Sequence, residues 1–270
     1  MILEQNHILE APNKKPILLD ISYEGEKTNK PVVVFCHGYK GFKNWGAWHL
    51  VAADFAKAGF CFVKFNFSHN GGTMENPIDF PDLEAFANNS FTTELDDLDR
   101  VLHFLAASEV SLIAHSRGAG IALIKAEEDP RIQKVVTWAG VSDYKAHFQI
   151  GTDAFQQWKK TGITHIENAR TKQQLPHYWQ FFEDFIANEH RLTIKRAVQQ
   201  LKKEHLIIHG SADSTVSLKE AQAMHQWNPE SQLIVLEAGD HVFGSKHPWE
   251  EPTLPTDLKT VVDRTIRFIQ

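Results

Sequence analysis

The segment around Ser116 carries the residue types that nucleophilic chemistry requires. It reads Ala114-His115-Ser116-Arg117-Gly118, follows the apolar run VSLI and opens a run of small residues, GAGIALIKA. A serine on such a strand-to-helix turn projects its hydroxyl from the edge of a sheet, and the helix N-terminus adds positive potential beside it. The turn is tight, so its neighbours must be small, as Ala114 and Gly118 are. A serine that caps an ordinary helix has the same local pattern, so this segment alone leaves both interpretations open.

A second segment can supply the groups that stabilise developing negative charge. His37-Gly38 follows the apolar run VVVFC and precedes Tyr39. A glycine turn at this point lets the backbone N–H of Tyr39 face the same pocket as the N–H of Arg117. Two such donors form an oxyanion hole, in which each contributes about a few kcal/mol of transition-state stabilisation. We therefore predict Tyr39 and Arg117 as the oxyanion donors.

Two further segments supply an acid and a base. The segment GSAD, which ends at Asp213, directly follows the apolar run LIIH, and GDH, which ends at His241, comes a few residues after LIVL. A serine hydroxyl is a poor nucleophile until a base takes its proton, and a buried carboxylate orients that base. The sequence therefore predicts Ser116 as the nucleophile, His241 as the general base and Asp213 as the acid that orients it.

Two other aspartates compete for the role of the acid. Asp143 follows the strand that is expected to end at Trp138, and it is the main rival. Asp213 is favoured because it lies in the turn just after a strand, where the acid of such a triad is expected. Asp240 is adjacent to His241 and is too close along the chain to reach its Nδ1 comfortably.

The 15 histidines of the chain must be mostly structural or exposed. His205 and His209 are four residues apart, but they lie in a strand-like run, where this spacing does not form the metal-binding pair of a helix. No cluster of cysteines or carboxylates completes a site, so neither a metal nor a cofactor is predicted. His37 and His115 flank the predicted pocket and are expected to make structural hydrogen bonds.

The elements that position these residues alternate between short apolar runs and longer helical patterns. The expected strands are 16–23, 31–36, 60–67, 110–114, 135–138, 206–209 and 233–236, and the expected helices are 45–58, 93–107, 116–128 and 257–269. This alternation predicts a parallel sheet with helices on both faces. Ligands in such folds bind beyond the carboxyl ends of the strands, which is where the segments described above lie.

One connection is too long to be a simple loop. Roughly sixty residues separate the strand that ends near Trp138 from the strand that begins near Leu206, and most connections are far shorter. This connection contains an aromatic stripe at helical spacing, made of Tyr178, Phe181, Phe182 and Phe185 with Trp179 alongside. We predict that residues 144–203 form a helical lid inserted in a single domain of residues 1–270. The stripe is typical of a packed helix face and also of a substrate-binding wall.

Composition excludes several classes of function. The net charge of −6 argues against a nucleic-acid partner or an anionic membrane surface. No apolar run is long enough to span a membrane, and no secretory signal is visible near the N-terminus. Cys36 and Cys61 lie in apolar runs and are expected to be buried free thiols. These features together predict a cytoplasmic location.

The four ordered segments HGYKG, AHSRG, HGSAD and GDHVFG resemble the signatures of the α/β-hydrolase superfamily over nearly the whole chain. The resemblance is closest to the branch of serine carboxylesterases, feruloyl-esterase-like and dienelactone-hydrolase-like proteins. The dienelactone hydrolases proper use a cysteine nucleophile, so their reaction does not carry over to Ser116. The resemblance implies a doubly wound, mostly parallel eight-stranded α/β sheet, an acyl-enzyme mechanism and a lid after the sixth strand.

The sequence therefore predicts a serine hydrolase that cleaves a small-molecule carboxylic ester. A thioesterase, an amidase or a small peptidase would use the same triad, because the acyl half of the mechanism is shared. A catalytically silent binding protein on the same fold is an alternative from another class.

Overall fold

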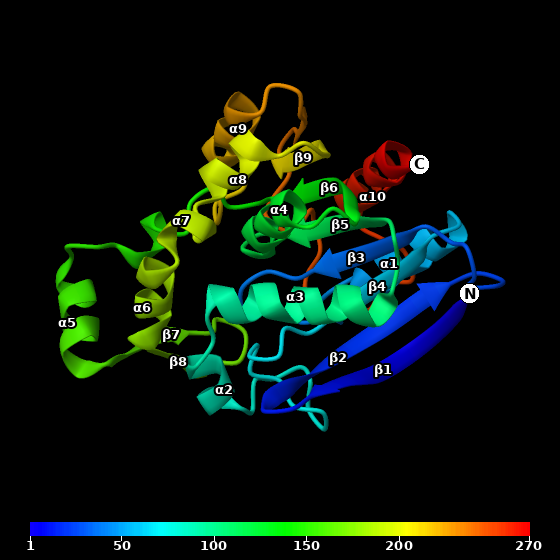
Figure 1. Cartoon of the computed structure of the whole chain (residues 1–270). Coiled ribbons are helices and arrows are strands. Elements are labelled where there is room, and N and C mark those ends of the chain that lie inside the picture. Colours follow the sequence, from blue (N-terminus) through cyan, green and yellow to red (C-terminus); the bar gives the residue numbers. More distant parts are fainter.

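The computed structural model describes all residues 1–270, and its framework is one eight-stranded sheet (Figure 1). In spatial order the strands are β1 (Ile2–Ala11), β2 (Lys14–Tyr23), β4 (Cys61–Phe65), β3 (Val32–Cys36), β5 (Val110–His115), β6 (Ile132–Trp138), β9 (Glu204–Gly210) and β10 (Gln232–Leu236). The pairs β1–β2 and β2–β4 are antiparallel, and all other neighbours are parallel. The predicted eight-stranded, mostly parallel sheet is confirmed.

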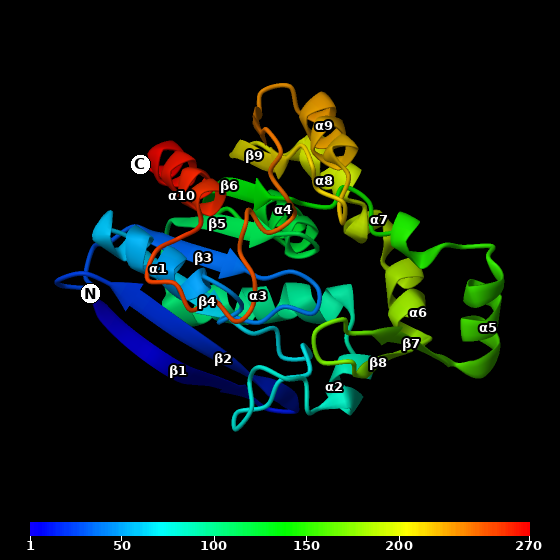
Figure 2. The ribbon, with the colours of Figure 1, turned by 180° about the vertical axis from the view of Figure 1, so that it is seen from behind.

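Helices cover both faces of this sheet, which is the doubly wound arrangement that the sequence predicts. The helices outside the connection between β6 and β9 are α1 (Trp48–Lys57), α2 (Leu83–Ala87), α3 (Phe91–Leu105), α4 (Gly118–Glu128), α9 (Leu218–Trp227) and α10 (Thr256–Ile269). Helices α3, α4 and α9 pack on one face, and α1 and α10 pack on the other (Figures 1 and 2). Strands β3 and β5 are buried along almost their whole length because both faces are covered.

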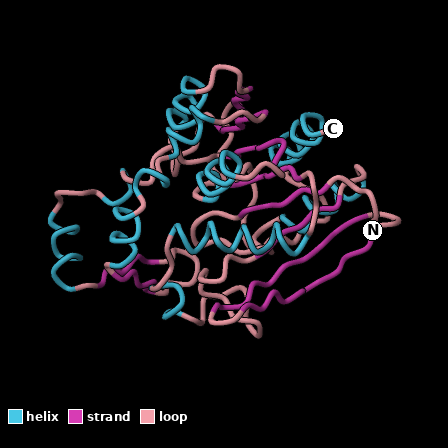
Figure 3. The backbone as a smooth tube through the Cα atoms, viewed as in Figure 1, coloured by secondary structure: helices cyan, strands magenta, loops and turns pink.

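The long connection between β6 and β9 extends beyond the carboxyl ends of β3 and β5, and its last part returns to pack on α4 and α9 (Figure 1). It contains a 3₁₀ turn (Ala146–Phe148), α5 (Asp153–Thr161), β7 (Ile163–Glu167), β8 (Gln174–Tyr178), α6 (Gln180–Ala187), α7 (Glu189–Leu192) and α8 (Ile194–Gln200). The expected helices are present in this insertion, and it also contains an antiparallel hairpin of β7 and β8 that the sequence analysis did not predict (Figure 3). Tyr178 is the last residue of β8, so the helical part of the aromatic stripe begins only in α6.

Strand β1 is absent from the expected elements, of which the first begins at residue 16. It is an edge strand that pairs only with β2, and most of its side chains are exposed or half-buried. It therefore lacks the apolar pattern that reveals a buried strand.

The two cysteines are buried free thiols, as predicted. None of the helices combines the length and the apolar character that a membrane crossing requires.

A buried charged cluster fixes the loop that follows β3. Lys43 in this loop donates hydrogen bonds from Nζ to both carboxylate oxygens of Asp20 on β2, each at 2.8 Å. Lys64 on β4 donates to Oδ2 of Asp20 at 2.7 Å, and all three side chains are buried. Burial opposes ionisation of Asp20, but the charge of Lys64 and the hydrogen bonds from both lysines outweigh it and lower the pKa. The same loop carries Tyr39, so the cluster ties a predicted oxyanion donor to the sheet.

We predict that Asp20→Asn lowers the free energy of unfolding by about 3–5 kcal/mol, because two buried ammonium groups lose their counter-charge. Urea denaturation at neutral pH measures this loss. The matched control is Asp263→Asn, which removes an exposed carboxylate paired with Lys259 on α10. This control should cost less than about 1 kcal/mol. Equal losses in the two variants would contradict the anchoring role of the cluster.

Candidate functional site

Ser116 lies at the sharp turn between β5 and α4, with a backbone φ of 55°. A non-glycine residue in this left-handed region is strained, and such strain persists only where the surroundings hold it. The amide of Ser116 donates to the carbonyl of Trp138 at 2.9 Å, and its own carbonyl accepts from Ala119 at 3.0 Å. A Cβ atom at Gly118 would lie 2.5 Å from the backbone oxygen of His37, so only glycine fits there.

The structure brings Ser116, His241 and Asp213 together from three separate strand ends. Nε2 of His241 lies 3.1 Å from the hydroxyl oxygen of Ser116. Nδ1 of His241 lies 2.8 Å from Oδ2 of Asp213. Asp213 follows β9 and His241 follows β10, so both reach the edge of the sheet at which β5 delivers Ser116. This arrangement has the geometry of a nucleophile, a base and an orienting acid.

The carboxylate of Asp213 is held in place by several donors. Its Oδ1 accepts from the backbone N–H groups of Thr215 and Val216 at 2.8 Å each. Nε2 of His209 lies 3.3 Å from Oδ2, and the side chain of Asp213 is fully buried. Burial opposes ionisation, but the hydrogen bonds from His209, His241 and Val216 outweigh it and hold the pKa of Asp213 well below its usual value. The carboxylate is therefore charged at neutral pH.

The two rival aspartates have other roles. Asp143 is exposed, and its Oδ1 accepts from the backbone N–H of Lys145 at 2.7 Å. Asp240 is exposed as well, and its Oδ1 accepts from Val242 and Gly244 within its own turn. Both carboxylates thus cap local turns, and neither is bonded to the imidazole of His241.

The loop after β3 lies against Ser116. A Cβ atom at Gly38 would lie 2.8 Å from Cβ of Ser116, so the two segments approach as closely as glycine allows. The hydrogen bonds of the structure use neither the backbone N–H of Tyr39 nor that of Arg117. Both N–H groups are therefore free to donate to a bound oxygen, as the oxyanion-hole prediction requires, and that assignment remains a prediction.

Two buried histidines make structural hydrogen bonds around the site. Nδ1 of His37 bonds the carbonyl of Gly38 at 2.8 Å, and its Nε2 accepts from Phe67 at 3.2 Å. Nε2 of His115 bonds the carbonyl of His241 at 2.8 Å, and the two imidazole rings lie 4.8 Å apart. Burial lowers the pKa of His37 to about 4 and that of His115 to about 3. Both rings are thus neutral at pH 7 and hold the backbone around the site.

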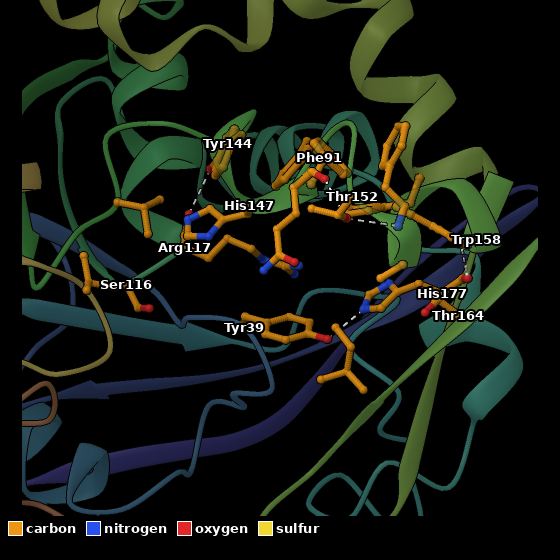
Figure 4. A pocket seen from close by; sticks show the side chains of 18 of the residues that line it. Tyr39, Phe91, Ser116, Arg117, Tyr144, His147, Thr152, Trp158, Thr164 and His177 are labelled. Carbon is orange, nitrogen blue, oxygen red and sulfur yellow. Dashed lines mark hydrogen bonds between the residues drawn. The ribbon is translucent and has the colours of Figure 1, made fainter.

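A cavity of about 510 Å³ opens beside Ser116 (Figure 4). Its walls come from the loop after β3, from α3, from the turns after β5, β6 and β9, and from the long connection after β6. The aromatic side chains that line it are Tyr39, Phe91, Tyr144, Phe148, Phe155, Trp158 and Phe181. Arg117 is the only lining side chain with a permanent charge, and its guanidinium is paired with the buried Glu94. No cluster of three or more His, Cys, Asp or Glu side chains has the arrangement of a metal site.

His177 also lines this cavity, and the sequence patterns do not anticipate it. Nε2 of His177 lies 2.7 Å from the hydroxyl oxygen of Tyr39. His177 lies on β8, and the segment around it has no motif. Only the folded hairpin brings it to the cavity, so no local signal in the sequence could have identified it.

Residues 31–200 match the family described as alpha/beta hydrolase fold, and the chain belongs to this family. A protein from Agrobacterium vitis S4 is similar in structure at 17% identity and a TM-score of 0.77, over 100% of each chain. Est1E from Butyrivibrio proteoclasticus is similar at 11% identity and a TM-score of 0.74, over 98% of each chain. Mouse alpha/beta hydrolase domain-containing protein 10 is similar at 16% identity and a TM-score of 0.69, over 98% of each chain. No curated protein matches the sequence.

At these identities the solved structures share the fold, and the fold does not fix the reaction. The predicted resemblance to the α/β-hydrolase superfamily is confirmed by the family match. Membership of this family supports a hydrolytic activity, and the geometry of the site bears on which bond is cleaved.

Proposed function

We propose that this protein is a serine hydrolase that cleaves a carboxylic ester through an acyl-enzyme on Ser116. The observation that supports this proposal best is the continuous hydrogen-bonded chain from Ser116 through His241 to Asp213. This chain lies at the carboxyl ends of the strands, and Ser116 lines the cavity of about 510 Å³ described above. Ligands in open α/β sheets bind at this edge.

In the proposed first step, Oγ of Ser116 attacks the carbonyl carbon of the ester while its proton passes to Nε2 of His241. The carbonyl oxygen becomes an oxyanion, to which the backbone N–H groups of Tyr39 and Arg117 donate. The imidazolium then gives its proton to the departing alcohol, and the acyl group remains on Ser116. Water hydrolyses this acyl-enzyme with the same base, which releases the acid and restores the serine.

Asp213 is proposed to keep His241 in the tautomer that this chemistry needs. A charged carboxylate accepts a hydrogen bond from Nδ1–H, so the proton of the neutral imidazole stays on Nδ1 and Nε2 is left free to act as the base. It also stabilises the imidazolium that forms in the first step. The low pKa of Asp213 keeps the carboxylate charged throughout the neutral range.

Residues 144–203 are proposed to act as a lid within a single domain and to select the acyl group. Twelve of the residues that line the cavity come from this segment, so most of the cavity wall belongs to it. Apolar walls bind a bulky acyl group and exclude water from the reacting atoms. Est1E, which shares the fold, is known in a complex with ferulic acid, and the aromatic cavity fits an acyl group of that kind.

Thioesters and amides are the alternatives with the same triad, because the acyl-enzyme is common to all of them. Initial rates on p-nitrophenyl esters beside matched thioester and anilide substrates separate these classes. A catalytically inactive binding protein would hydrolyse none of these substrates.

The nucleophile assignment predicts that a fluorophosphonate labels Ser116 and that Ser116→Ala lowers kcat by about 10³- to 10⁶-fold. Peptide mass spectrometry locates the adduct, and p-nitrophenyl acetate hydrolysis gives the rate. The control is Ser108→Ala, an exposed serine before β5 that should behave as the unmodified protein. Unchanged labelling or hydrolysis in Ser116→Ala would rule out the proposed mechanism.

Substitutions at two adjacent phenylalanines of α6 distinguish a role in substrate selection from a role in packing. Phe181 lines the cavity, whereas Phe182 packs against Phe148, Phe155 and Trp179. We predict that Phe181→Ala lowers the ratio of long-chain to short-chain ester rates by about tenfold, because a bulky acyl group loses an apolar contact. Phe182→Ala should lower the melting temperature and leave this ratio unchanged. A fixed ratio in Phe181→Ala would show that this residue serves packing alone.

A further inference from the structure

The side chain of Tyr39 contacts side chains from two other elements of the fold. The guanidinium carbon of Arg117 lies 4.7 Å from the centroid of the Tyr39 ring. The imidazole of His177 stacks on the same ring, with centroids 5.7 Å apart and planes inclined by 28°. The hydroxyl of Tyr39 and Nε2 of His177 are 2.7 Å apart, and Figure 4 shows this hydrogen bond across the cavity wall. One predicted oxyanion donor is thus fixed by side chains from the turn between β5 and α4 and from β8.

Arg117 is itself held at both of its ends. Its guanidinium is ion-paired with Glu94 of α3, which is almost fully buried and also accepts a hydrogen bond from Asn89 at 2.8 Å. Its backbone oxygen accepts from the hydroxyl of Tyr144 at 2.8 Å. Arg117 therefore gives the ring of Tyr39 a fixed contact from the turn between β5 and α4.

His177 is equally fixed within the long connection. Its backbone oxygen accepts from Nε1 of Trp158 at 2.9 Å. Its ring lies 5.1 Å from that of Phe86 and 5.3 Å from that of Phe181, and only 5% of the residue is exposed. A side chain packed in this way cannot follow a displaced Tyr39 without moving the hairpin.

The two partners of the hydrogen bond between Tyr39 and His177 both stay uncharged around neutral pH. Burial raises the pKa of Tyr39 to about 12. Burial, and to a smaller extent the charge of Arg117, lowers the pKa of His177 to about 3. A phenol stays neutral below its pKa and an imidazole stays neutral above its pKa, so both groups are uncharged between about pH 5 and pH 9.

We propose that His177 is a positioning residue that holds Tyr39, and with it the backbone N–H of the oxyanion hole, at the distance the reaction needs. The long connection then completes the catalytic site in addition to lining the cavity. This inference rests on the proposed function. It has a physical consequence, because a donor that shifts by about an ångström loses a large part of its effect on the transition state.

The test is a double-mutant cycle with Tyr39→Phe, His177→Phe and the double variant, each with its melting temperature. Both single variants should lower kcat about tenfold on p-nitrophenyl acetate and on longer esters alike, with KM nearly unchanged. The double variant should be no slower than either single variant, because both remove the same hydrogen bond. His177→Gln should recover part of the rate that His177→Phe loses, since its amide can reach the position of Nε2. The midpoint of the pH dependence of kcat should be the same in these variants as in the unmodified protein.

Tyr178→Phe is the matched control. Tyr178 is the next residue along β8, its hydroxyl bonds Oε2 of Glu84 at 2.7 Å, and it does not line the cavity. Like Tyr39→Phe, this variant removes a hydrogen bond made by a tyrosine hydroxyl, but it should leave kcat unchanged.

Ser116→Ala in the same assay distinguishes a failure of the proposed function from a failure of the inference. If Ser116→Ala stays active, the proposed function fails and the inference fails with it. If Ser116→Ala is inactive while Tyr39→Phe and His177→Phe keep the kcat of the unmodified protein, only the inference is overturned. A loss confined to KM on long esters would also overturn it, because His177 would then be a substrate contact. If His177→Phe has a clearly lower melting temperature than the unmodified protein, its kcat is not interpreted. Tyr39→Phe keeps the aromatic ring, and its kcat then tests the inference by the same criteria.

Discussion

The hydrogen bond between His241 and Asp213 is the constraint on which the proposed chemistry depends. It joins the turn after β9 to the turn after β10, and it points Nε2 of His241 at a serine delivered by β5. The parallel sheet makes this meeting possible, since β5, β6, β9 and β10 are successive neighbours with their carboxyl ends on one edge. The turn around Asp213 contributes as well, because the donors that lower its pKa also fix the direction of its carboxylate.

Buried charges hold the remaining parts of the site. Asp20 secures the loop that carries Tyr39, and Glu94 secures the guanidinium of Arg117. Each carboxylate is almost completely buried and is paired with a cation from the segment that it anchors. A buried ion pair adds little to stability by itself, but breaking one is costly, so such pairs suit the fixing of a loop in one position. His177 extends this fixation to the proposed lid through a neutral hydrogen bond.

Much of the fold and the triad geometry could be predicted because their signals are local. Ser116, Asp213 and His241 each follow an apolar run, and the ends of parallel strands meet at one edge, so their proximity follows from the sequence pattern. Strand β1 escapes detection because it faces solvent, and strand β8 because Tyr178 at its end matches the helical spacing of the aromatic residues in α6. His177 could not be predicted, since its contact with Tyr39 spans 138 residues and exists only after the hairpin has folded.

The most direct test of the central claim compares Asp213→Asn with Asp143→Asn. Asparagine keeps the shape of the side chain but offers Nδ1 of His241 no charged acceptor. The proposed mechanism predicts that Asp213→Asn lowers kcat/KM by about 10⁴-fold. Asp143→Asn, at an exposed turn, should stay within about twofold of the unmodified protein. A larger loss in Asp143→Asn than in Asp213→Asn would contradict the mechanism, because His241 would then depend on a carboxylate that the structure leaves unbonded to it.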